Sequence, residues 1–185
     1  MQPTLGVPWE PAKIGAEIAA DGGARTPGVG RMALRTKTGH AIRLGSVTQV
    51  RFAGDPPTGE DQPLRLQMDG LRLWVAVAPA RGRAPRVEVR AGPVTVRIGG
   101  SGVAFRSGAD GSMLVRVFHG SAVCSGPQDR RDWTRTLKGG EEFVVAADGA
   151  PGESRSLRRE DSEKMWERWN EEQDAAAYGG PPVPK

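Results

Sequence analysis

The sequence contains few of the residues on which chemistry at protein sites usually depends. Its 185 residues include one cysteine, two histidines and 5% aromatic residues. The single cysteine, Cys124, excludes an internal disulfide. A metal site needs three or four convergent ligands, which so few histidines and cysteines do not supply in any recognisable spacing. The sequence therefore predicts no metal and no cofactor.

The ionisable residues that are present do not form a catalytic pattern. His40 and His119 each adjoin a turn glycine, and no ligand-type spacing connects them. Cys124 stands in an alternating strand pattern, which favours a buried structural thiol over a nucleophile. Glu141 and Glu142 are neighbours on a predicted strand, where successive side chains point to opposite faces. We therefore expect a protein that is not an enzyme.

Long apolar runs are also missing. No stretch approaches the length of a membrane span, and the first residues, MQPTLGVPWEP, lack the basic start and apolar core of a signal peptide. A location outside the cytoplasm would therefore require an export signal encoded upstream of Met1.

Glycine and proline, by contrast, are abundant, with 26 and 15 residues scattered between short apolar runs. Apolar residues alternate with polar ones in most of these runs, as expected for strands with one buried face. This pattern predicts an all-β fold, an irregular β-sandwich or β-solenoid-like module of many short strands. The strands are expected around residues 32–34, 42–44, 50–52, 64–68, 71–77, 87–89, 94–98, 103–105, 113–117, 122–124, 137 and 143–145.

Turn residues separate the predicted strands. Asp69-Gly70 and Asp110-Gly111 each stand between two alternating runs, and Asp-Gly supplies the positive φ angles of a type I′ hairpin turn. Residues 53–63 and 126–132 are predicted to be exposed loops because they are rich in prolines and charges.

The charge is unevenly distributed along the chain. The net charge is +4, but residues 160–185 contain seven acidic and three basic residues, so the first 159 residues carry +8. Arg65, Arg72 and Arg97 alternate with aliphatic residues, which favours arginines on the solvent face of strands. A basic surface also suits an anionic partner, but the scarcity of aromatics for base stacking argues against nucleic acid. Contact with a glycan or with anionic lipid stays open.

The C-terminal part has a different character. Residues 160–177 are rich in good helix formers, and Gly179-Gly180 and Pro181-Pro182 end the helix. We therefore divide the chain into a β module (1–150), a helical extension (151–178) and a Gly/Pro tail (179–185). Met165, Trp166 and Trp169 are spaced to share one helical stripe. They are predicted to pack on the protein's own sheet or to bind a partner.

The order of strands and turns resembles the FecR domain, an extracytoplasmic bacterial module. The matching segments are Lys13–Ile18, Ala33–Thr36 with Ile42–Leu44, Gly70–Val77, Gly102–Phe105, Asp110-Gly111, Val115–Val117, Gly120–Val123 and Leu137–Glu141, together covering roughly residues 9–147. In such proteins an Arg-Trp-Asn helix often follows the module, as Arg168-Trp169-Asn170 does here. The resemblance implies a first short strand at residues 13–18.

The resemblance also implies a function. We expect a non-enzymatic module of the periplasm or cell envelope that acts as a scaffold or signalling component. Its partners would be other envelope proteins or copies of itself, bound through the β-surface and the C-terminal helix. The alternative is a module that binds polysaccharide or peptidoglycan, which would require exposed aromatics in a flat platform.

Overall fold

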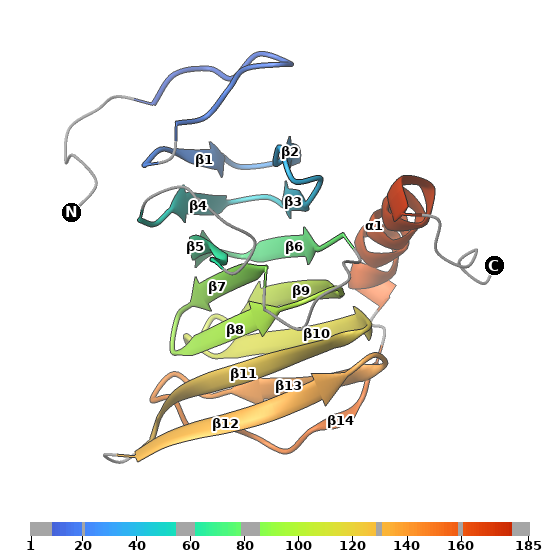
Figure 1. The fold of residues 1–185 in the computed structure, drawn as a ribbon. Coiled ribbons are helices and arrows are strands. Elements are labelled where there is room, and N and C mark those ends of the chain that lie inside the picture. The colour runs from blue at the N-terminus through green and yellow to red at the C-terminus, as the bar shows by residue number, and fades with distance from the viewer. Residues whose placement is uncertain are drawn as a thin grey trace.

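The computed structural model describes residues 9–19, 21–54, 62–78, 86–128, 131–158 and 161–178. Within these ranges the chain forms two 7-stranded sheets and one helix, α1 (Asp161–Tyr178). Figure 1 shows the strands stacked from β1 and β2 at one end to β12 and β14 at the other, with α1 beside the sheets. The predicted all-β fold with a single C-terminal helix is confirmed. The predicted tail and most of the predicted loop 53–63 lie outside the described residues.

The two sheets are named here A and B. Sheet A consists, in spatial order, of β1 (Gly23–Thr26), β4 (Thr48–Phe52), β5 (Leu64–Gly70), β7 (Val87–Ala91), β8 (Val94–Ile98), β11 (Ser121–Gln128) and β12 (Arg131–Lys138). Sheet B consists of β14 (Arg155–Ser156), β13 (Glu141–Val145), β10 (Met113–His119), β9 (Gly102–Ser107), β6 (Arg72–Ala76), β3 (Ala41–Leu44) and β2 (Met32–Arg35).

The chain crosses repeatedly between the sheets, usually after forming a hairpin in one of them. The hairpins β2–β3, β4–β5, β7–β8, β9–β10 and β11–β12 are antiparallel. Between β5 and β7 the chain adds the single strand β6 to sheet B and then returns, so β5 and β7 pair in parallel. This stretch makes one full turn around the core, which gives the sandwich its solenoid-like character.

The core fills the space between the sheets and follows the period of two expected of strands. On β6, for example, Leu73 and Val75 point inward and are fully buried, and Phe105 on β9 and Phe143 on β13 pack in the same layer. The buried apolar cluster of the sandwich contains no residue of α1. The sandwich therefore has a core that does not depend on the helix.

Two predicted segments are wrong in detail. Residues 13–18, expected as the first strand, contain a turn at Ile14 and Gly15, and the first strand is β1 at Gly23–Thr26. Residues 126–132, expected as an exposed loop, belong largely to β11 and β12, which pair as far as Gln128 and Arg131. Within the segment 151–178, the short strand β14 pairs with β13 before the helix starts.

The two Asp-Gly turns have different roles. Asp110-Gly111 connects β9 and β10, which are neighbours in sheet B, and the Asp110 carboxylate accepts hydrogen bonds from the backbone and side chain of Ser112. Asp69-Gly70, also predicted as a hairpin turn, instead leads from β5 in sheet A to β6 in sheet B. It is a corner between the sheets.

Gly70 is expected to be hard to replace at this corner. Its φ is +116°, and a Cβ added there would lie 2.1 Å from the carbonyl oxygen of Val47. Gly70→Ala should therefore lower the free energy of unfolding by about 2–3 kcal/mol, because backbone strain and a backbone clash add together. Gly140 is the matched control, since it has φ +86° and no atom within 4 Å of the added Cβ. Gly140→Ala should cost about 1 kcal/mol, and equal losses in urea unfolding would contradict the clash.

Candidate functional site

Helix α1 lies on the outer face of sheet B, and the strands place a continuous row of residues beneath it. Arg43, Trp74, Ala104, Arg116 and Glu142 stand directly opposite one another on β3, β6, β9, β10 and β13. Each occupies an outward position, and Arg43, Trp74, Ala104 and Arg116 stand between two core residues, as strand alternation requires. All five are nevertheless buried, with at most 7% of their surface exposed.

The helix turns mostly polar side chains toward this face. Glu163, Trp166, Glu167, Asn170 and Asp174 follow one another at intervals of one, three or four residues and are all buried. The charged residues Lys164, Arg168 and Glu172 are exposed on the opposite side. Three acidic residues of the C-terminal part, Glu163, Glu167 and Asp174, therefore contact the sheet.

The three residues predicted as a stripe do not share one face. Trp166 is 5% exposed and packs in a small apolar cluster with Ala41, Trp74, Ala76 and Ala104. Trp169 is half-buried and stacks on Trp166, with 5.7 Å between ring centroids. Met165 is 77% exposed and points to solvent. Both tryptophans thus pack on the protein's own sheet, and binding of a partner by these residues stays a prediction.

At the C-terminal half of the helix, Asp174 connects three strands. One carboxylate oxygen accepts a hydrogen bond of 2.6 Å from the Arg43 guanidinium, and the other accepts one of 2.8 Å from the Trp74 indole nitrogen. Nε2 of His119, at the end of β10, lies 3.9 Å from the second oxygen. The last turn is fixed by Tyr178, whose hydroxyl donates to the Gly39 carbonyl at 2.7 Å.

At the middle of the helix, Arg116 joins the sheet to α1. Its Nε donates to Glu142 at 2.9 Å, one terminal nitrogen donates to Glu167, and the other donates to the Arg158 carbonyl at 2.9 Å. The second oxygen of Glu142 accepts a hydrogen bond of 2.8 Å from Arg155. Arg116, Glu142 and Glu167 have side chains that are at most 4% exposed, so these charges are compensated by one another instead of by water.

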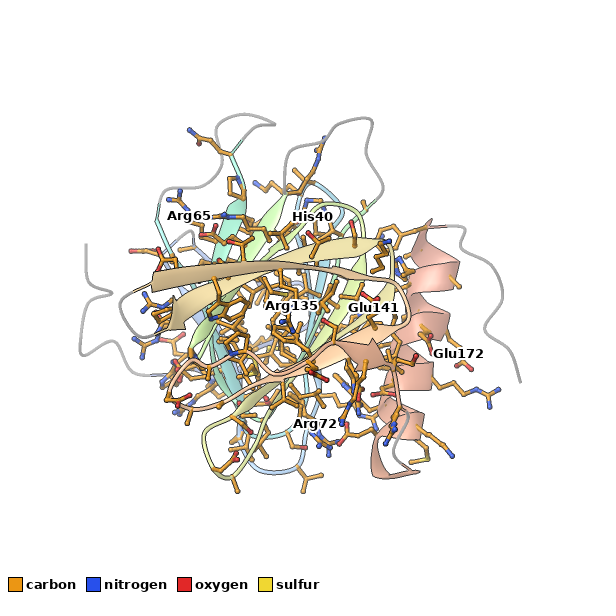
Figure 2. All side chains as sticks on the ribbon, turned by 90° about the horizontal axis from the view of Figure 1, so that it is seen from below. His40, Arg65, Arg72, Arg135, Glu141 and Glu172 are labelled. Atoms are coloured by element: carbon orange, nitrogen blue, oxygen red, sulfur yellow. The ribbon has the colours of Figure 1, made fainter. Side chains whose placement is uncertain are left out.

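At the N-terminal half of the helix, Glu163 meets two arginines that stand opposite each other on β6 and β9. Its carboxylate lies 2.7 Å from Arg72 and 3.5 Å from Arg106. Figure 2 shows Arg72 beside α1 and Arg65 on the far side of the sandwich. The expectation of solvent-facing arginines holds for Arg65 and Arg97, whose side chains are 62% and 50% exposed.

The buried arginines are a functional feature that the sequence pattern did not reveal. An arginine at an outward strand position gives the same sequence pattern whether water or a helix covers that position. Buried ion pairs contribute little net stability, because desolvation opposes their attraction, but a mismatched partner leaves a costly unpaired charge. A helix without an acid at the position of Asp174, for example, would leave the Arg43 guanidinium buried without this partner.

Of the residues weighed earlier for chemistry, Glu142 and His119 lie at this interface, and Cys124 lies in the core between the sheets. The Cys124 thiol is completely buried, and burial raises its pKa to about 12. Burial also lowers the pKa of His40, helped by the charge of Arg86, and His40 Nδ1 accepts a hydrogen bond of 3.3 Å from the Ala78 backbone. Among the described residues, no three His, Cys, Asp or Glu side chains gather as a metal-binding group.

The burial of Cys124 gives a testable pH dependence. A thiol with a raised pKa stays protonated in the folded state while the unfolded chain ionises from about pH 9, so its contribution is complete below that pH and is lost as the pH rises. We expect stability to fall between pH 9 and 12 more in the wild type than in Cys124→Ala, as measured by urea unfolding. A thiol reagent should label Cys124 only after unfolding. Rapid labelling of the native protein would contradict this burial.

In the part of the chain that the structure describes, no helix is long and apolar enough to cross a membrane. The fold is that of a two-sheet β module closed on one face by a C-terminal helix. No family model and no curated protein matches the sequence.

Two solved structures share the fold, both of a candidate anti-sigma factor from Parabacteroides distasonis, at 1.65 and 2.50 Å resolution. Each has a TM-score of 0.60 and 19% sequence identity, and the match covers 80% of the present chain. The chain spans 63% and 64% of the length of those proteins. At this level of identity the similarity concerns the fold alone.

Proposed function

We propose that this chain is a FecR-like, non-enzymatic module of the bacterial cell envelope that binds other proteins as a scaffold or signalling component. The order of motifs in the sequence supports the family, and the fold shared with a candidate anti-sigma factor is consistent with regulation through protein contacts. The location in the periplasm or envelope follows from the proposed family.

The structural feature that best supports binding of other proteins is the end of the sandwich formed by β1 and β2. These strands are the outermost of sheets A and B at this end, as the sheet orders of the described residues place them. The neighbouring segments expose apolar side chains, with Ile14 and Val29 fully exposed and Ile18 36% exposed. Outermost strands next to exposed apolar residues are typical sites for strand addition by a partner.

The alternative, binding of polysaccharide or peptidoglycan, has less support. Such a site would need exposed aromatic side chains in a flat array. Of the aromatic residues in the described ranges, only Trp9 is classed as exposed, at 39%, and the Arg25 guanidinium covers its ring at 4.7 Å.

The proposal can be tested in cells that produce the natural full-length protein. A photo-crosslinking amino acid placed at Val29 should give adducts with other proteins in the envelope fraction. The same amino acid at Glu153, exposed on the segment before β14, is the control and should give none. Fractionation with the cytoplasm, or equal crosslinking from both positions, would overturn the proposal. Adducts that disappear on digestion with glycan-degrading enzymes would favour the alternative.

A further inference from the structure

The helix and the sandwich have separate apolar cores. The cluster between the sheets contains no residue of α1. The cluster under the helix is small and independent, with Trp166 as its one fully packed helical member and the small residues Ala41, Ala76 and Ala104 on the sheet side. The sandwich can therefore keep its own packing when the helix leaves, which makes α1 a separable occupant of sheet B.

Complementary charge adds to the packing of Trp166 between the helix and the sheet. Glu163, Glu167 and Asp174 on α1 meet Arg72, Arg116 and Arg43 on the sheet. An empty face would leave Arg43 and Arg72 without these acids, whereas Arg116 would keep Glu142 and lose Glu167. Trp74 is also left unpaired when Asp174 is removed, since its indole donates to that carboxylate. The face thus requires an occupant with acids and a tryptophan at the spacing found in α1.

We propose that the outer face of sheet B is a receptor for an acidic, tryptophan-bearing helix, and that α1 of a second copy of this chain can occupy it by reciprocal exchange. The second copy is the occupant that carries the required spacing of Glu163, Trp166, Glu167 and Asp174 by identity. Reciprocal exchange of one element produces a twofold dimer with two identical interfaces. This surface is distinct from the strand edges proposed above, so the inference stands or fails independently of that function.

The chain is attached to sheet B as far as Arg158. The backbone of Leu157 donates to the Gly140 carbonyl, and that of Arg158 donates to Glu142 at 3.3 Å. The helix begins at Asp161. Exchange of α1 therefore leaves these contacts and the pairing of β14 with β13 in place.

Charge reversal on full-length chains tests the exchange. The face variant, Arg43→Glu/Arg72→Glu, keeps a wild-type helix but repels it. The helix variant, Glu163→Arg/Asp174→Arg, keeps a wild-type face but repels its own helix. Neither variant can dock α1 on itself or on a copy of itself. A mixture offers one wild-type helix to one wild-type face, and one reversed helix to one reversed face.

We expect the mixture to form a heterodimer at least about tenfold more abundant than the homodimer of either variant, as measured by sedimentation and native mass spectrometry. The matched control replaces the face variant by Arg65→Glu/Arg97→Glu, which has the same net charge but alters the exposed face of sheet A. The control mixture should give no comparable heterodimer, because only one of its two exchanged interfaces would join a wild-type helix to a wild-type face. A monomeric test mixture, or equal heterodimer formation in the control, would overturn the proposal.

Retention of the fold is checked separately in each variant. Because the substituted residues lie outside the core between the sheets, the strand signal in far-UV circular dichroism should match that of the wild type. If a double variant loses this signal, the single variants Arg72→Glu and Glu163→Arg repeat the mixture, and the same outcomes decide.

Discussion

Replacing Arg116 by alanine is expected to lower the free energy of unfolding by about 3–5 kcal/mol. Arg116 is the shared partner of Glu142 and Glu167, whose side chains are 0% and 2% exposed. Removal of the guanidinium leaves two carboxylates buried next to each other without a compensating positive charge from this position. The loss should appear as a lower midpoint in urea unfolding and as early release of the helix in hydrogen exchange.

Arg155 provides a matched control for this prediction. It pairs with the same carboxylate, Glu142, but its own side chain is 52% exposed. Water can replace much of what this exposed arginine contributes, so Arg155→Ala should cost at most about 1 kcal/mol. Similar losses for Arg116→Ala and Arg155→Ala would show that burial does not decide the cost at this network.

The second large effect is expected from Trp166→Ala/Trp169→Ala. Trp166 is the main apolar anchor of α1 on sheet B, and Trp169 stacks on it while the Arg31 guanidinium lies 5.5 Å from each ring. Truncation of a buried tryptophan typically costs about 3–5 kcal/mol. We expect the helical signal of the double variant to melt at a lower temperature than the strand signal, because the sandwich core lacks residues of α1.

Met165→Ala is the control on the same helix, since Met165 is 77% exposed. Its substitution should change stability by no more than about 0.5 kcal/mol. An unchanged melting curve for the double tryptophan variant, together with loss of an oligomer, would mean that these residues act only between molecules. No change in either property would make the helix a passive extension.

Strand alternation was the most reliable guide to the fold. Side chains on a strand alternate between its two faces. The spacing of Leu73 and Val75 on β6, and that of Val94 and Val96 on β8, therefore predicts a buried face. Alternation did not predict the first strand, β1. The buried side chains of β1 are Ala24 and Thr26, which are too small and too polar to stand out as an apolar run. The segment at 13–18 has a better apolar pattern, yet Ile14 is fully exposed.

Turn chemistry was a weaker guide, because it specifies a local conformation and not the destination of the chain. Gly70 and Gly111 both have positive φ, but Asp69 and Asp110 do not, so neither turn is of the predicted type I′. The turn does not decide whether the next strand pairs with its predecessor or crosses to the other sheet. Asp110-Gly111 closes a hairpin, whereas Asp69-Gly70 forms a corner although the edge of β5 is later paired by β7.

The sequence by itself determined the all-β class, the single C-terminal helix and the burial of Cys124, since each follows from a local period or propensity. It also contained both halves of the helix interface, as arginines alternating on strands and acids spaced on a helix. Only the tertiary structure decided that these halves face each other. Arg43 and its partner Asp174 are separated by 131 positions, and no local rule states which outward face of which sheet a helix will cover. That choice depends on the small residues that let α1 approach sheet B and on the match of its carboxylates to the arginines there.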